Sequence, residues 1–147
     1  MSSERHIFGD HYTDGKPCVT VKVAIVNEEN GRQITIQKTV KIDTGFDGGI
    51  HVAEHHKADV TMIGVNPVVG TVTLAGETPS TAYHCLAYLQ QIGNFQLPMP
   101  GIEMVLVLHG TAQRGLLGLD ILKHWIVKFD GPNEFFKITS SSAQPPR

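Results

Sequence analysis

Residues 19–45 read VTVKVAIVNEENGRQITIQKTVKIDTG, and their pattern decides the fold class. Apolar and polar residues alternate along 19–25 and again along 34–42, with one interruption in the second segment, which is the period of a half-buried β-strand. Between the two segments, Asn30-Gly31 supplies the positive φ angles that a tight hairpin turn needs. The second strand therefore runs directly into the closing Asp-Thr-Gly triplet.

The rest of the chain contains more candidate strands than candidate helices. Short strands are expected at 71–74, 81–89, 95–97, 102–108, 126–129 and 135–138, and short helices at 52–59 and 120–125. The first two of these strands form a long hairpin with Gly and Pro at its tip. Because no strands alternate with helices in βαβ order, we expect an all-β fold, a closed barrel or sandwich with one or two short helices.

The length of 147 residues fits one domain, which we expect to span residues 18–139. Residues 1–17 are polar and without periodicity, so they are expected to form an N-terminal arm. Residues 140–147 are rich in Ser and Pro and are expected to form a disordered tail.

Composition narrows the class of protein. A net charge of -2 with only 12 Lys and Arg residues argues against a nucleic-acid partner, because phosphate binding needs a clustered basic surface. No apolar run is long enough to cross a bilayer, and no signal peptide is evident, so we expect a cytoplasmic protein without a membrane partner. Cys18 and Cys85 are too few for a disulfide framework and are expected to be reduced and buried.

Two motifs occur in order along the chain. Residues 41–49 read KIDTGFDGG, and residues 115–122, about 70 positions later, read GLLGLDIL. The pair resembles the two hallmarks of the retropepsin-like family of single-domain aspartic proteases, and the resemblance covers residues 19 to about 138. The hairpin at 71–89 falls where that family carries its flap.

The resemblance implies a homodimeric aspartic endopeptidase with Asp43 as the catalytic carboxyl group of each chain. Two adjacent carboxyl groups that share one proton can take a proton from water and give one to the carbonyl oxygen of a peptide bond. This chain has one Asp-Thr-Gly triplet and no Asp-Ser-Gly, so the second carboxyl group must come from another copy. No metal or other cofactor is needed for this chemistry.

The remaining site residues follow from the same resemblance. Thr44 and Gly45 would shape the catalytic loop, with Leu116, Leu117 and Gly118 packing beneath it as support. An extended peptide or protein substrate would lie under the flap, where apolar pockets give a preference for apolar side chains. The residues expected to contact it are Asp47, Gly48, Ile50, Val72, Leu74, Gly76 and Val107.

Other functions remain open at this point. A catalytically silent dimeric β-rich module on the same scaffold would bind peptides or proteins without cleaving them. A monomeric domain that binds peptide or metal is a third possibility. Zinc at Glu54, His51, His55 and His56 is disfavoured, because the Glu-x-x-His order of a zinc-protease helix is absent and no distant third ligand stands out.

Overall fold

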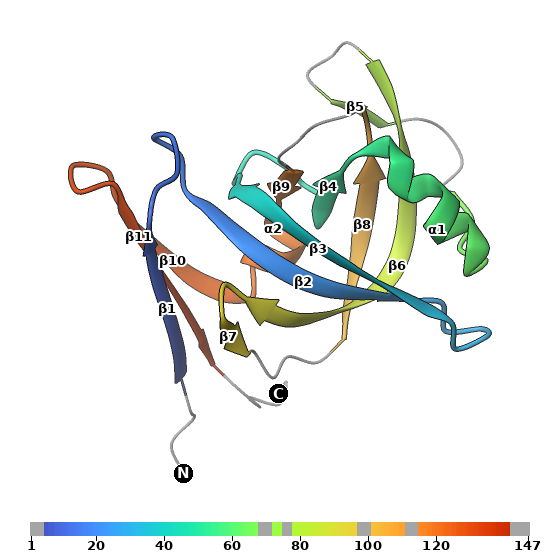
Figure 1. Ribbon diagram of the computed structural model, residues 1–147, viewed down its shortest axis with the longest axis horizontal. Helices are drawn as coiled ribbons and strands as arrows, with labels where there is room; N and C mark the ends of the chain where they lie inside the picture. The colour runs from blue at the N-terminus through green and yellow to red at the C-terminus, as the bar shows by residue number, and fades with distance from the viewer. Residues whose placement is uncertain (1–4, 68–71, 75–77, 97–100, 111–114, 142–147) are drawn as a thin grey trace.

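The computed structural model describes residues 5–67, 72–74, 78–96, 101–110 and 115–141. The chain forms a closed six-stranded mixed β-barrel, a separate three-stranded sheet and two short α-helices (Figure 1). The expected all-β class with a closed barrel is therefore confirmed. No helix within the described residues is long and apolar enough to cross a membrane.

The barrel is closed because its last strand pairs with its first. Its strands, in order around the barrel, are β2 (Cys18–Val26), β3 (Gln33–Ile42), β9 (Gly115–Leu117), β4 (Ile50–Val52), β8 (Ile102–Leu108) and β6 (Thr78–Ile92). The β3–β9 and β4–β8 pairs are parallel, and the other pairs are antiparallel. The two parallel pairs lie next to the Asp-Thr-Gly loop and distinguish this barrel from a simple meander.

The hairpin of β2 and β3 forms as the sequence pattern predicts. Val19 pairs with Val40 and Val23 with Ile36, and all four side chains are buried. Gly31 in the connecting turn has a φ of +73°, a backbone conformation that favours glycine. The alternation of the sequence is thus the alternation between the barrel core and the outside.

β6 is the longest strand and joins three parts of the molecule. Its start pairs with β5 (Val72–Leu74), its middle with β8 and its end with β2. The short β7 (Phe95–Gln96) folds back on the last residues of β6. The expected long hairpin at 71–89 is therefore present as β5 and β6, at one end of the barrel (Figure 1).

The helices are displaced from their expected positions. The segment expected at 52–59 is helical only from η1 (Glu54–His56) through α1 (Lys57–Met62), since Val52 still pairs with Leu108 in the barrel. The second helix, α2 (Leu119–Leu122), ends early. The reason is that the chain enters the next sheet at Trp125.

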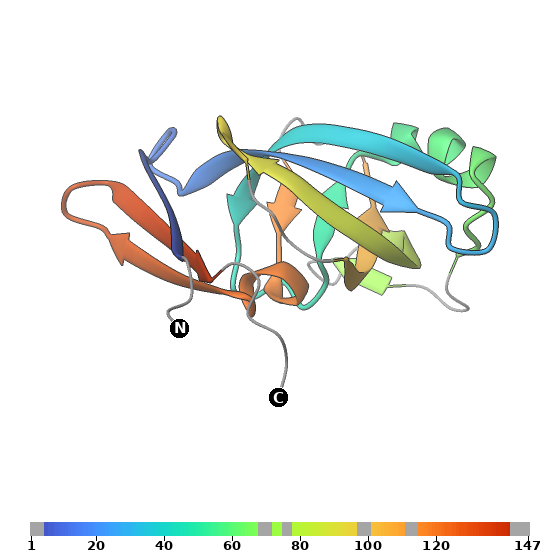
Figure 2. The same ribbon diagram turned by 90° about the horizontal axis from the view of Figure 1, so that it is seen from below.

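Residues 5–11 do not form a free arm. β1 (Arg5–His11) pairs with β11 (Phe135–Ser141), which in turn pairs with β10 (Trp125–Asp130). This three-stranded sheet lies beside one end of the barrel (Figure 2). Residues 1–17 show no strand pattern in the sequence. β1 could not be predicted from them, because its hydrogen bonds come from a partner strand far away in the sequence.

Candidate active site

Asp43 begins a surface loop directly after β3. Its backbone N–H donates to the Leu117 carbonyl at 2.9 Å, and its Oδ1 accepts the Gly45 N–H at 2.9 Å. The Phe46 N–H donates to the Asp43 carbonyl at 3.2 Å. The carboxyl group is therefore held in place while the Asp43 side chain remains half-exposed.

The chain encloses β9 between the two strands that flank this loop. β3 pairs with β9 on one side, and β4, which follows the loop, pairs with β9 on the other. Beyond β9, the Gly118 N–H donates to the Gly49 carbonyl at 2.8 Å and the Leu119 N–H donates to the Phe46 carbonyl at 2.9 Å. The segment at 115–119 thus fixes loop 43–49, as expected for a supporting segment.

Gly118 is where the segment at 115–119 approaches the backbone of loop 43–49 most closely. A Cβ atom at this position would collide with the backbone carbonyl oxygens of Gly48 and Phe46. Gly115 is similarly constrained, since a Cβ there would meet the carbonyl oxygen of His51. Both glycines permit backbone segments to approach more closely than any side chain would allow.

Asp120 has a structural function. Its Oδ2 accepts the Val105 N–H of β8 at 2.9 Å, and its own N–H donates to the Gly48 carbonyl at 3.1 Å. Asp120 does not cap α2, because the N-cap position is Gly118 and no side chain caps that helix. Asp120 instead ties α2 and loop 43–49 to the edge of β8.

Asp43 lies on the outside of the barrel wall. Its N–H continues the parallel ladder in which Lys41 pairs with Leu116 and Ile42 with Leu117. Because side chains alternate along a strand, Asp43 follows Lys41 to the outer side, while Ile42 points into the core. Asp43 and the outer surface of β9 therefore belong to one face.

A row of side chains crosses this face from strand to strand. Leu116 pairs with His51, His51 with Val107, and Val107 with Ala82. Paired residues project to the same side of a sheet, so these four side chains form what we call the outer row. Phe46, Ala82 and Val107 are buried in a small apolar cluster with Val105 and Leu116, separate from the barrel core. Asp43 and the outer row therefore share one face of the barrel, and three of the four outer-row residues are apolar.

The expected substrate contacts separate into two groups. Val107 lies in the outer row, Asp47 is exposed on the loop, and Gly48 is buried beside it. Ile50, by contrast, packs in the barrel core with 2% of its surface exposed, so it does not reach the face that carries Asp43. The correction follows from the pairing of Ile50 with Leu117, a residue of the core side.

Three expected contacts belong to the segment of the β5–β6 hairpin. In the backbone, Val72 pairs with Ser80 and Leu74 with Thr78. Gly76 lies outside the described residues. The structure therefore confirms a hairpin at these positions, and the role of these residues stays a prediction.

The supporting residues are placed as follows. Leu117 is fully buried in the core beneath the loop, and Leu116 is half-buried on the outer face. Thr44 and Gly45 are exposed. No hydrogen bond to the Thr44 hydroxyl is found among the described residues, so that side chain is open to another molecule.

His51 was considered in the sequence only as a metal ligand, and its position in the outer row is a finding of the structure. It is 7% exposed, and within the described residues neither imidazole nitrogen has a hydrogen-bond partner. Burial lowers the pKa of His51 below 6.5, because it disfavours the charged form. The backbone of His109 partly opposes this shift, but it does not reach hydrogen-bond geometry. The His109 ring lies 5.9 Å away, centroid to centroid.

Two other kinds of site were considered, a metal site and a reactive thiol. No group of three or more His, Cys, Asp or Glu side chains that could hold a metal ion occurs in the described part of the chain. Both cysteines are buried and unpaired. Burial, and then the charge of Asp120, raise the pKa of the Cys85 thiol to about 12, so it stays protonated at neutral pH.

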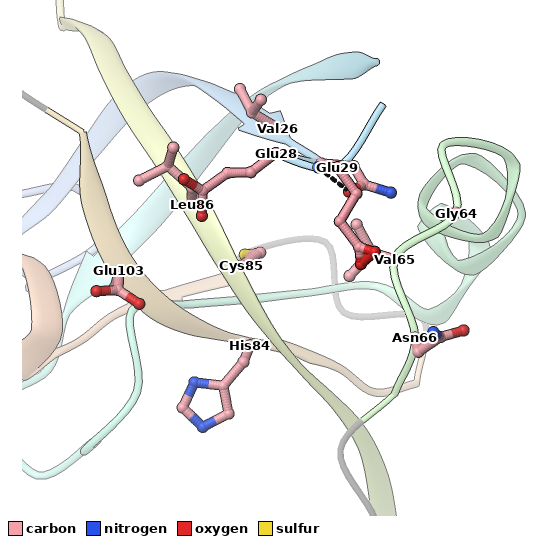
Figure 3. A pocket seen from close by; sticks show the side chains of 11 residues that line it. Val26, Glu28, Glu29, Gly64, Val65, Asn66, His84, Cys85, Leu86 and Glu103 are labelled. Atoms are coloured by element: carbon pink, nitrogen blue, oxygen red, sulfur yellow. Dashed lines mark hydrogen bonds between the residues drawn. The ribbon is translucent and has the colours of Figure 1, made fainter. Parts of the chain in front are cut away.

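A pocket of about 230 Å³ opens where β2 leaves β6 (Figure 3). Glu28 and Glu29 approach it from the end of β2, Val65 and Asn66 from the end of α1, and Cys85 from β6. Asp43 and the outer row do not line it. The pocket is therefore separate from the candidate active site.

The chain was compared with protein-family models and with curated proteins. No protein-family model matches the chain, and no curated protein matches it. The candidate site therefore depends on its own residues and geometry.

Proposed function

We propose that two copies of this chain form an aspartic endopeptidase, in which the two Asp43 carboxyl groups activate one water molecule. The observation that carries the proposal is the setting of Asp43. Its carboxyl group is half-exposed on a loop fixed by backbone hydrogen bonds, beside an apolar face. Such a loop can present a reactive group in one orientation without burying it.

The chemistry follows from two carboxyl groups about 3 Å apart, which cannot both be ionised and therefore hold one proton between them. The ionised group takes a proton from the water as its oxygen attacks the peptide carbonyl carbon. The protonated group gives its proton to the carbonyl oxygen, which forms a neutral tetrahedral diol. The first group then gives the proton it took from water to the amide nitrogen, and the second takes a proton from one diol hydroxyl as the C–N bond breaks, so the products are a carboxylic acid and an amine and the pair again holds one proton.

A second copy is required because a single chain supplies one such group. The only hydrogen bond to the Asp43 carboxyl group in the described residues comes from Gly45. The carboxylate of Asp120, the acidic residue of the supporting segment, accepts a hydrogen bond from the Val105 N–H instead. Thr44, Gly45 and Leu119, the last 37% exposed, leave the surface around Asp43 open to a partner copy. One site per dimer would serve both chains.

The central test replaces Asp43. The variant Asp43→Asn keeps the size of the side chain, so we expect a folded dimer that no longer cleaves unstructured protein substrates. Asp59→Asn, an equal change at an exposed position of α1, is the control and should cleave as the wild type does. Retained cleavage by Asp43→Asn would exclude the mechanism.

Mixing the two proteins tests the shared site. If one active dimer needs two intact Asp43 residues, an equal mixture of wild type and Asp43→Asn should retain about one quarter of the activity of undiluted wild type after subunit exchange. Independent sites would give about one half. Specific activity should also fall on dilution as the dimer dissociates, which light scattering follows in parallel.

A further inference from the structure

The pocket shown in Figure 3 lies where two strands of the barrel separate. The pairing of β2 with β6 ends at Val26 and Leu86. Beyond this point, His84 and Cys85 pair with β8 on one side, and no strand in the described part of the chain pairs with them on the other. The volume of about 230 Å³ is below the roughly 300 to 1,000 Å³ of pockets for drug-sized ligands, so it suits a single side chain.

One wall of the pocket is held in place by hydrogen bonds within the chain. The side-chain amides of Asn27 and Asn30 both donate to the Ile63 carbonyl, at 2.8 and 3.0 Å. These bonds tie the turn that follows β2 to the end of α1, and both segments line the pocket. The site is therefore formed before any ligand enters, which lowers the entropy lost on binding.

Three carboxylates surround the opening of the pocket, and we call them the acidic rim. Glu28 and Glu29 approach from the end of β2, and Glu103 from β8 (Figure 3). Glu103 projects to the pocket because it pairs with Leu86, which also pairs with Val26, and paired residues share one side of a sheet. No Lys or Arg is among the described residues that line the pocket. The charge of the acidic rim is thus not neutralised by the lining.

The inner part of the pocket is less polar than its rim. Cys85 is the only buried residue among the described residues that line it, with 9% of its surface exposed. No hydrogen bond to its thiol is found in that part of the chain. Val26, Val65 and Leu86 are half-buried. A ligand that fits must therefore combine an apolar portion with a positive charge.

We propose that this pocket binds the side chain of an arginine in an extended segment of a partner protein. The aliphatic stem of the arginine lies along Val65, Leu86 and the Cys85 thiol, and its guanidinium group stays at the acidic rim. Guanidinium N–H groups are arranged to match carboxylate oxygens. The proposal is independent of the catalytic one, because Asp43 and the outer row do not line this pocket.

The acidic rim and the apolar interior together exclude other classes of ligand. A carboxylate or a phosphate would be repelled by the rim, and Leu or Phe would leave the rim without a partner. A metal ion is a poor candidate, since no group of three His, Cys, Asp or Glu side chains able to hold one occurs in the described residues. Exposed ion pairs contribute little each, so the affinity should be modest and should fall as salt rises.

Titration of the full chain with short peptides tests the proposal. The peptides carry arginine, its uncharged isostere citrulline, leucine or glutamate at one central position between alanines. We expect the arginine peptide to bind about fivefold more tightly than the citrulline peptide at low salt, and less so at high salt. The backbone amide resonances of Cys85 and Leu86 should shift on binding, and those of loop 43–49 should not.

Variants assign the preference to the acidic rim. Glu28→Gln and Glu103→Gln should each weaken binding of the arginine peptide about twofold, and the triple variant with Glu29→Gln should remove the difference between arginine and citrulline. These residues are exposed, so the variants should fold as the wild type does. Glu54→Gln is the matched control, because Glu54 is exposed and does not line the pocket, and it should bind as the wild type does.

Several results would overturn the proposal. Among them are equal binding of the arginine and citrulline peptides, tighter binding of the glutamate peptide, and no saturable binding up to about 1 mM peptide. A loss in Glu54→Gln as large as in Glu28→Gln would show that the charge of the whole surface, and not the pocket, attracts the peptide. Self-association in light scattering that the triple variant removes would identify a second copy of the chain as the occupant.

Discussion

Loop 43–49 and the outer row lie on the same side of the barrel, yet they treat polar groups in opposite ways. In the loop, backbone groups of Asp43, Gly45, Phe46, Gly48 and Gly49 are paired within the loop, with the segment at 115–120 or with Val105 of β8. In the outer row, His51 is buried with both nitrogens unpaired in the described residues. The loop holds a half-exposed carboxyl group rigidly, whereas the outer row buries an imidazole that has no hydrogen-bond partner among the described residues.

The paired backbone groups of the loop stabilise the fold, whereas the unpaired His51 ring destabilises it. A paired backbone contributes to stability and keeps the carboxyl group in one orientation. An unpaired buried ring reduces stability, and functional sites are where proteins commonly accept such costs. Substitutions in the two regions should therefore change the free energy of unfolding with opposite sign.

The largest effect is expected at Gly118. In Gly118→Ala, the new Cβ would meet two backbone carbonyl oxygens that cannot move aside easily, so we expect a loss of about 3 kcal/mol in the free energy of unfolding. Urea denaturation measures it. Gly131→Ala is the control, because a Cβ there meets nothing within 4 Å, and it should change stability by less than about 0.5 kcal/mol. Equal effects would mean that the loop and β9 are not closely packed.

A smaller loss is expected at Asp120. The change Asp120→Ala removes the acceptor of the Val105 N–H, and leaving this partly buried donor unpaired should cost about 1 to 2 kcal/mol. Asp120→Asn keeps an acceptor oxygen and should lose less than half of that amount. Denaturation of both variants decides the matter, and an equal loss in the two would show that charge rather than the hydrogen bond is what counts.

At His51 the sign should reverse. His51→Leu removes two unpaired buried nitrogens from an apolar row, so we expect a gain of about 1 kcal/mol in stability. The exposed His84→Leu should remain close to the wild type in the same urea titration. A destabilised His51→Leu would mean that the ring already has a good partner in the free protein.

The smallest effect is in the pH dependence of stability. The pKa of His51 in the folded protein is below 6.5, its ordinary value, so the unfolded chain binds more protons as the pH falls through that region. Protonation of His51 therefore favours unfolding. The free energy of unfolding is not affected by this titration well above pH 6.5, and it decreases as the pH falls below 6.5. We expect the stability difference between wild type and His51→Leu to widen from about pH 7.5 to about pH 5.5. His56 and His124, whose pKa values are also lowered, are present in both proteins and cancel in this difference. A constant difference would contradict the lowered pKa of His51.

Much of the fold could be predicted from local sequence patterns. The alternation from Val19 to Ile42 predicted the hairpin of β2 and β3 and placed Asp43 at its end. The hairpin was predictable because strand period acts within a few residues. The support by Leu116, Leu117 and Gly118 was implied by the family resemblance, and in the structure a Cβ at Gly118 would meet the backbone of the loop.

Other features had no local signal. β1 depends on a partner strand more than a hundred residues later, so its own sequence carries no clear pattern. Ile50 and His51 are adjacent in a short strand of three residues, too short for its period to tell which side faces the core. The sequence suggested Ile50 as one of the substrate contacts, and His51 was considered only for a zinc site that the spacing disfavoured.

The sequence by itself determined the barrel class, the hairpin that ends at Asp43 and the glycines that support the loop. Only the tertiary structure decided that His51, and not Ile50, shares the face of Asp43, because the side on which a residue projects depends on which strand pairs with which. That pairing brings together residues from four separate strands, and no pattern within one strand specifies it.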